Sequence, residues 1–149
     1  MLDLNLPPFP INVKKKGERL TVFDPLRRRY VALTPEEWVR QHFINYLITE
    51  KGYPKNLIAN ETEINLNSLK RRCDSVVHNK ELSPIVIIEY KAPEIKITQA
   101  VFDQIARYNI VLRVKYLIVS NGIQHFCCKI DYDNQSFQYL PEIPYYTDL

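Results

Sequence analysis

The pattern of apolar and polar residues in the first third of the chain predicts two short strands and then a helix. Residues 19–23 and 30–33 have the composition of strands, and Asp24-Pro25 provides a turn that joins them. The segment Thr34-Pro35-Glu36-Glu37 combines an N-cap threonine, a proline at the first helical position and a glutamate three residues after the cap. The apolar stripe that follows predicts a helix that runs to about Glu50.

Past this helix, the apolar positions take the spacing of extended strands, interrupted by one further helix. Strands are expected at residues 57–66, 71–78, 84–91, 115–120, 124–131 and 136–140. The second helix is expected from about Thr98 to Val111, and Asn121-Gly122 is a strong hairpin turn. This order predicts an α/β fold in which helices flank a mixed β-sheet, with an extra N-terminal hairpin and extra C-terminal strands.

Composition supports one globular domain that spans residues 1–149. The chain is 46% hydrophobic and 25% charged, and its three glycines and lack of low-complexity sequence leave no flexible linker. No apolar run approaches the roughly 20 residues that span a bilayer, so no membrane partner is expected. The three cysteines form neither a disulfide framework nor a zinc spacing, and the N-terminus does not resemble a secretory signal. We therefore expect a cytoplasmic protein.

The most informative segment is the strand that begins Ile85-Val86-Ile87-Ile88 and ends with charged residues. Because strand side chains alternate, Glu89 and Lys91 share the face of Ile85 and Ile87. Charges on an apolar strand cost free energy unless a partner, metal or substrate compensates them. The alternative is a surface ion pair at a strand end, which would stabilise the protein by at most about 1 kcal/mol.

A third charged group is expected beside this pair. If the strands on either side of residues 79–84 pair as a hairpin, Asp74 comes to lie next to Glu89, and Cys73 faces the other side of the sheet. Two adjacent carboxylates repel each other unless a cation lies between them, and Mg²⁺ is the natural choice. Lys91 would then hold a water molecule or a phosphate oxygen.

Three basic triplets stand out although the net charge is only +3: residues 14–16, 27–29 and 70–72. Such triplets are usually solvated surface. The third one, Lys70-Arg71-Arg72, lies just upstream of Asp74, separated from it by Cys73, which places it to contact a backbone phosphate. We expect DNA binding of this kind to be electrostatic and weakly sequence-specific.

Asp74 followed by Glu89-Tyr90-Lys91 on the next strand resembles the D…(E)xK core of the PD-(D/E)XK nuclease superfamily. Several local segments are also similar to the N-terminal nuclease domain of type I restriction enzyme R subunits, namely residues 34–41, 70–74, 88–93, 102–109 and 120–122. The resemblance spans roughly residues 20–130. It implies a restriction-endonuclease-like core of order α-β-β-β-α-β at about residues 34–131.

The resemblance also implies roles for single residues. Asp74, Glu89 and the backbone carbonyl of Tyr90 would be ligands of Mg²⁺, for which Mn²⁺ can substitute, and Lys91 would be the catalytic lysine. Glu37 would be the helical acid of the family, which contacts the metal through water or orients the site. Glu37 is equally well explained as an acid favoured at a helix start, and Glu36 could take either role.

Gln104 and Tyr108 match the QxxxY motif that follows the catalytic core in these nucleases. Their i, i+4 spacing puts both on one helix face, so the resemblance implies that they serve the catalytic site and bind DNA together with Lys70, Arg71 and Arg72. They could also be ordinary helix residues.

Two departures from the family limit what can be transferred. Cys73 replaces the proline of the PD motif, and no G-x-x-x-x-G-K-[ST] sequence occurs, so no ATP site is expected. The resulting hypothesis is a metal-dependent DNA endonuclease without a motor domain, whose partners are DNA and separate restriction or motor subunits. The sequence leaves open whether the protein forms a homodimer. The alternative is a catalytically silent DNA-binding or partner-docking module of the same fold.

Overall fold

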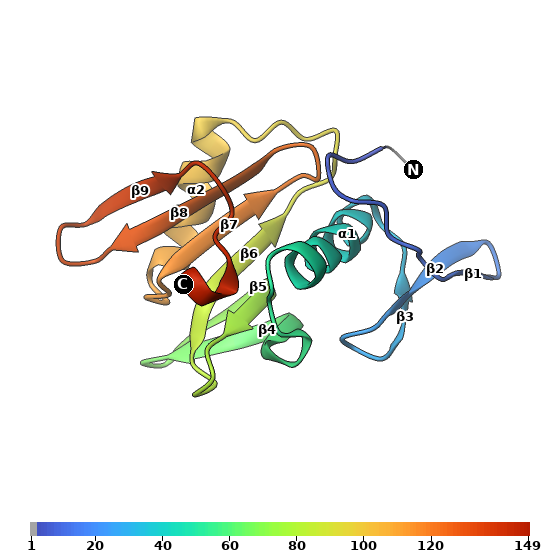
Figure 1. The fold of residues 1–149 in the computed structure, drawn as a ribbon, viewed down its shortest axis with the longest axis horizontal. Helices are drawn as coiled ribbons and strands as arrows, with labels where there is room; N and C mark the ends of the chain where they lie inside the picture. Colours follow the sequence, from blue (N-terminus) through green and yellow to red (C-terminus); the bar gives the residue numbers. More distant parts are fainter. Residues whose placement is uncertain (1–2) are drawn as a thin grey trace.

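The computed structural model describes residues 3–149; Met1 and Leu2, the first residues of the predicted domain, lie outside the described residues. It contains two β-sheets and two α-helices (Figure 1). The strands are β1 (Val13–Lys16), β2 (Arg19–Asp24), β3 (Arg29–Ala32), β4 (Ile58–Leu66), β5 (Leu69–His78), β6 (Pro84–Tyr90), β7 (Tyr116–Ser120), β8 (His125–Asp131) and β9 (Ser136–Leu140). The helices are α1 (Pro35–Glu50) and α2 (Gln99–Ile110), with short 3₁₀ helices at Lys55–Leu57 and Tyr146–Asp148.

The main sheet has the strand order β4-β5-β6-β7-β8-β9. Only β6 and β7 pair in parallel, and the other neighbours are antiparallel. The parallel pair follows from α2, which lies between these two strands in the chain and returns it to the same end of the sheet. The predicted mixed sheet and the core order α-β-β-β-α-β are confirmed.

The two helices cover opposite faces of this sheet. On one face, Phe43 and Leu47 of α1 belong to the same buried cluster as Ile88 of β6. On the other face, Phe102 of α2 belongs to a cluster with Ile87 of the same strand. Because neighbouring residues of β6 go to different clusters, the strand is buried on both sides, which explains its unbroken aliphatic run. None of the helices in residues 3–149 is long and apolar enough to cross a membrane.

The N-terminal part forms more structure than the sequence predicts. The expected hairpin is present as β2 and β3, but β1 adds a third strand that contains the first basic triplet. We call residues 13–32, which comprise β1–β3, the basic arm. It projects beyond α1 on the side away from α2 (Figure 1).

One expectation about the main sheet is wrong. Strict alternation would place Cys73 on the same side as Ser75 and away from α2. Instead Cys73 is fully buried in the cluster that contains Phe102 of α2. Alternation fails because the pairing of β4 with β5 is interrupted between Cys73 and Ser75. Opposite this break, Glu61 of β4 has a positive φ of 51°.

Candidate functional site

The ends of β5 and β6 bring Asp74 and Glu89 together. Ser75 pairs with Ile88, so Asp74 comes next to Glu89 as the two strands part. Asp74 Oδ2 accepts a hydrogen bond from the Tyr90 backbone N–H at 2.9 Å, and its carboxylate also shares a hydrogen bond with the Glu89 side chain. Burial, together with the charge of Asp74 and this hydrogen bond, raises the pKa of Glu89 well above its usual range.

Lys91 lies on the same side as these carboxylates. Its backbone N–H donates to the Ser120 carbonyl at 2.9 Å, which continues the parallel pairing of β6 with β7 and holds the strand end in place. The positive charge of Lys91 favours the ionised form of Glu89 and partly offsets the effects that raise its pKa. The structure thus brings together the three predicted residues Asp74, Glu89 and Lys91, while the side chain of Tyr90 lies on the α1 side.

Sequence reasoning missed Asn109 of α2. Its side chain is only 2% exposed, donates to the Ile105 carbonyl at 2.9 Å and hydrogen-bonds Glu89. Its Oδ1 atom is buried with no partner among the described residues. The sequence does carry a sign of this residue, because Asn109 interrupts the apolar stripe formed by Phe102, Ile105 and Ala106.

The predicted DNA-binding residues fall into two groups. Arg71 stacks on the ring of Tyr108, with its guanidinium carbon 4.8 Å from the ring centroid, and Gln104 is exposed one turn earlier on α2. Arg72 is exposed and donates from Nε to Glu61 at 3.0 Å, and Lys70 is exposed at the start of β5. Arg71, Gln104 and Tyr108 therefore share the α2 side with the carboxylates.

Glu37 lies on the opposite, α1 side. It is buried and accepts hydrogen bonds from Arg27 Nη2 at 2.6 Å and Gln41 Nε2 at 2.9 Å. Arg40 Nε lies 3.3 Å from Glu37 Oε1, and Arg40 Nη1 donates to the backbone carbonyl of Asp74 at 2.7 Å. Arg40 thus connects Glu37 to strand β5. Glu36 is exposed, so Glu37 is the acid of this helix start that faces the interior.

A buried chain of hydrogen bonds completes the α1 side. Tyr90 Oη donates to Ser75 Oγ at 3.0 Å, Ser75 Oγ donates to Asn60 Oδ1 at 2.6 Å, and Asn60 Nδ2 donates to Asp24 Oδ2 at 3.1 Å. Burial disfavours the charge of Asp24. Hydrogen bonds from Arg27, Asn60 and the Leu26 N–H nevertheless lower its pKa below the ordinary value, and so does the charge of Arg27.

The donor set beside Lys91 fits a hard cation. Two carboxylates and a backbone carbonyl are oxygen ligands of the kind that Mg²⁺ uses, with water and substrate completing its coordination. The unpartnered Oδ1 of Asn109 adds a buried oxygen next to Glu89. Within residues 3–149, no group of three or more histidine, cysteine, aspartate or glutamate side chains is placed to hold a metal, so this site has no third carboxylate.

Comparison with known proteins identifies similar sequences and folds. A family model described as type I restriction enzyme R protein N terminus matches residues 35–144. Among solved structures, the chain is similar to one described as "The fragment structure of a putative HsdR subunit of a type I restriction enzyme from Vibrio vulnificus YJ016", with 21% identity and a TM-score of 0.50. That match covers 75% of this chain and 24% of the other, and at this identity it shows the fold alone. The comparison with curated proteins found no match.

Proposed function

The chain belongs to the family of type I restriction enzyme R protein N termini, and on this premise we propose that it is a Mg²⁺-dependent DNA endonuclease domain. The observation that carries the proposal is the half-buried pair of carboxylates beside Lys91, in which Asp74 raises the pKa of Glu89. A protein gains nothing in stability from partly burying two adjacent acids, whereas a cation-dependent reaction requires them.

Each residue has a task in this proposal. Asp74, Glu89 and the Tyr90 carbonyl hold the ion. When bound, Mg²⁺ supplies an acidified water and neutralises charge on the scissile phosphate. Lys91 donates from Nζ to a water or a phosphate oxygen and thereby orients it. Asn109 is a positioning residue, because its hydrogen bond to Glu89 favours the ionised carboxylate and fixes its orientation.

The α2 side supplies the DNA contacts. Arg71 and Tyr108 form a cation–aromatic pair that can contact a phosphate and a sugar or base, and Gln104 adds an exposed amide. Lys70 and Arg72 extend the positive charge along β5. The matched HsdR chain is about three times as long as this one, since the match covers 75% of this chain and 24% of the other. We therefore propose that cleavage in the cell involves separate restriction or motor subunits, or a homodimer that cuts both strands.

A plasmid assay tests the proposal. Supercoiled, linear and single-stranded DNA are incubated with the protein in Mg²⁺, in Mn²⁺ and in chelator, and products are resolved on gels. We expect metal-dependent nicking that Glu89→Gln and Lys91→Gln each reduce by about 10³-fold, the scale of losing one group that stabilises transition-state charge. Glu94→Gln and Lys96→Gln are matched controls, because both residues are exposed a few positions later.

A second measurement keeps the proposal testable if cutting requires a partner. Mn²⁺ binding to the isolated protein is followed by calorimetry and by electron paramagnetic resonance, for the wild type, Asp74→Asn and Glu89→Gln. We expect one site that both substitutions weaken. DNA binding that is indifferent to metal, without a Mn²⁺ site and without cutting, would establish the silent DNA-binding module instead.

A further inference from the structure

The basic arm carries a concentration of charge that the candidate site does not use. Residues 13–32 contain seven lysines and arginines but only two acids, Glu18 and Asp24. The arm also lies outside residues 35–144, the part of the chain that the family model matches. Its role therefore has to be inferred from its own geometry.

The two faces of the basic arm differ in what they contact. The face that contains Val22 and Asp24 is anchored, because these residues are 0% and 1% exposed. Directly opposed residues share a face, so the register Lys14–Thr21–Ala32 and Lys16–Arg19 assigns the other face. That free face presents Lys14, Lys16 and Arg19, all of them exposed.

The free face is hollowed and contains an aromatic ring. A surface hollow of about 690 Å³ is lined by the small side chains of Thr21 and Ala32 and by residues that include Lys14, Lys16 and Arg19. The Lys14 ammonium is 4.7 Å from the centroid of the Tyr30 ring. Within residues 3–149, the ion pairs all involve other cations, so Lys14, Lys16 and Arg19 keep their charges available for an outside partner.

One end of the basic arm is anchored to α1 and to β4. Arg27 pairs with both Asp24 and Glu37, which joins the end of the arm to the start of α1. Asp24 is also the last member of the buried hydrogen-bond chain that begins at Tyr90. Ligands lose less entropy when they bind to a surface that is already ordered, so this anchoring favours binding to the free face.

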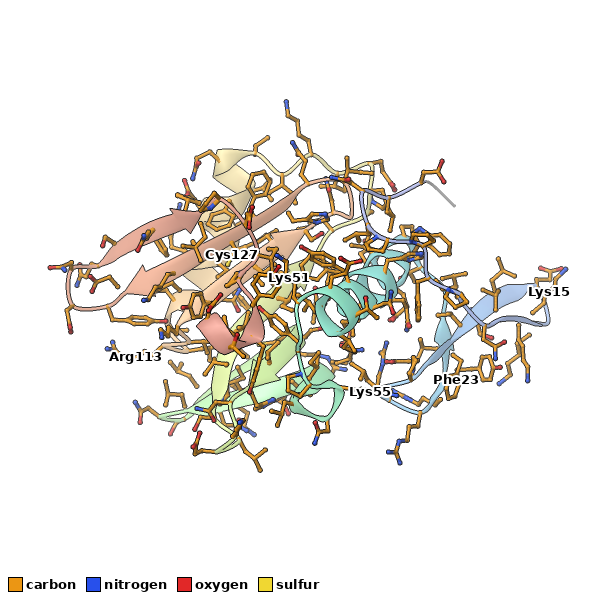
Figure 2. All side chains as sticks on the ribbon, viewed as in Figure 1. Lys15, Phe23, Lys51, Lys55, Arg113 and Cys127 are labelled. Carbon is orange, nitrogen blue, oxygen red and sulfur yellow. The ribbon has the colours of Figure 1, made fainter. Side chains whose placement is uncertain are left out.

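From this arrangement we propose that the free face of the basic arm binds backbone phosphates of double-stranded DNA, as a contact separate from that of α2. The choice of DNA as the polyanion rests on the proposed function. Cations on one face without acids suit the closely spaced phosphates of a duplex, whose contacts supply affinity that does not depend on sequence. Figure 2 shows Lys15 near the outer end of the arm and Arg113 at the opposite end of the molecule, so the arm lengthens the surface that can contact a duplex.

The test compares two triple variants with equal loss of charge. Lys14→Gln, Lys16→Gln and Arg19→Gln are combined in one full-length chain, and the exposed residues Lys80, Lys115 and Lys129 are changed to Gln in the control. Binding to a labelled 30-base-pair duplex is measured by fluorescence anisotropy in chelator, so that no cleavage occurs, at several salt concentrations. Circular dichroism confirms that both variants are folded.

We expect the arm variant to bind at least about tenfold more weakly at 0.1 M salt. Its slope of log affinity against log salt should fall by about 2 to 3, since each lost phosphate contact removes about 0.9. The control should change little. Equal affinities and slopes for the arm variant and the wild type, or an equal loss in the control, would overturn the inference and leave an acidic protein as the partner of this face.

The outcome is separable from that of the proposed function. If the wild type never cuts or binds Mn²⁺ but the arm variant loses DNA affinity, the proposed nuclease fails and the DNA-binding arm stands. If the wild type cuts DNA and the arm variant binds as well as the wild type, the nuclease stands and the arm inference fails.

Discussion

The two faces of the β5–β6 strand ends hold polar groups in opposite ways. On the α1 side, the chain from Tyr90 through Ser75 and Asn60 to Asp24 links each side chain to the next by hydrogen bonds. On the α2 side, the charge of Asp74 raises the pKa of Glu89, and Asn109 leaves one oxygen without a partner among the described residues. Residues of the same two strands thus contribute to one satisfied and one unsatisfied polar cluster.

This difference separates structural from functional polarity. A buried network whose members are all paired makes the fold rigid and specific, and its loss should appear mainly as lost stability. Buried groups that repel each other or lack partners stay in a protein only when something outside the chain completes them. The predictions below ask whether the two faces respond in these different ways.

The largest effect on stability is expected at the α1 face. Asp24→Ala leaves Arg27 without one of its two acids and Asn60 Nδ2 without its acceptor, in a buried setting. Breaking such a pair costs about 3 kcal/mol, so the free energy of unfolding in urea should fall by that amount. Mn²⁺ affinity of the folded protein should remain within about twofold. Asp133→Ala, in an exposed turn, is the matched control with a change of at most about 0.5 kcal/mol.

The α2 face should show the reverse behaviour. Asn109→Leu removes the hydrogen bond to Glu89 and also the unpartnered Oδ1, so stability should change by less than about 1 kcal/mol. Mn²⁺ affinity measured by calorimetry should fall about 10- to 100-fold, the usual consequence of losing a group that orients a metal ligand. Gln104→Leu on the same helix should weaken DNA binding but leave Mn²⁺ affinity unchanged. Equal metal affinity in Asn109→Leu and the wild type would contradict the positioning role.

The smallest effect concerns pH and belongs to the α1 face. His125 Nε2 donates to the Asn5 carbonyl at 3.1 Å, its Nδ1 lies 2.7 Å from Ser120 Oγ, and burial lowers its pKa. The unfolded chain therefore takes up a proton near pH 6.5, while the folded protein resists it to lower pH. The contribution of His125 to the free energy of unfolding should therefore be constant above about pH 6.5 and fall as the pH is lowered toward 5. His125→Gln, compared with the wild type in pH-dependent thermal unfolding, should abolish that part of the decline; parallel curves would refute it.

Much of the fold and the site could be predicted because each depends on local patterns. The cap at Thr34 is confirmed by the hydrogen bond from the Glu37 N–H to its hydroxyl at 3.1 Å. Alternation along β6 correctly separated Glu89 from Tyr90, and hairpin pairing correctly brought Asp74 to Glu89. Strand β1 was missed, because three consecutive lysines have no apolar alternation and pair only through the backbone with β2.

The roles of Asp74, Glu89 and Lys91 stay a prediction, but their placement shows what a sequence can decide. The amino-acid sequence by itself determined the helices, most strands and which side of β6 each side chain takes, because these follow from periods of two or 3.6 residues. Only the tertiary structure decided the positions of Cys73, Asn109 and Glu37. Alternation holds only while the backbone stays regular, and it fails for Cys73, which lies on the α2 side next to the interrupted pairing of β4 with β5. The contacts of Asn109 with Glu89 and of Glu37 with Arg27 join different elements of the fold, which no local pattern encodes.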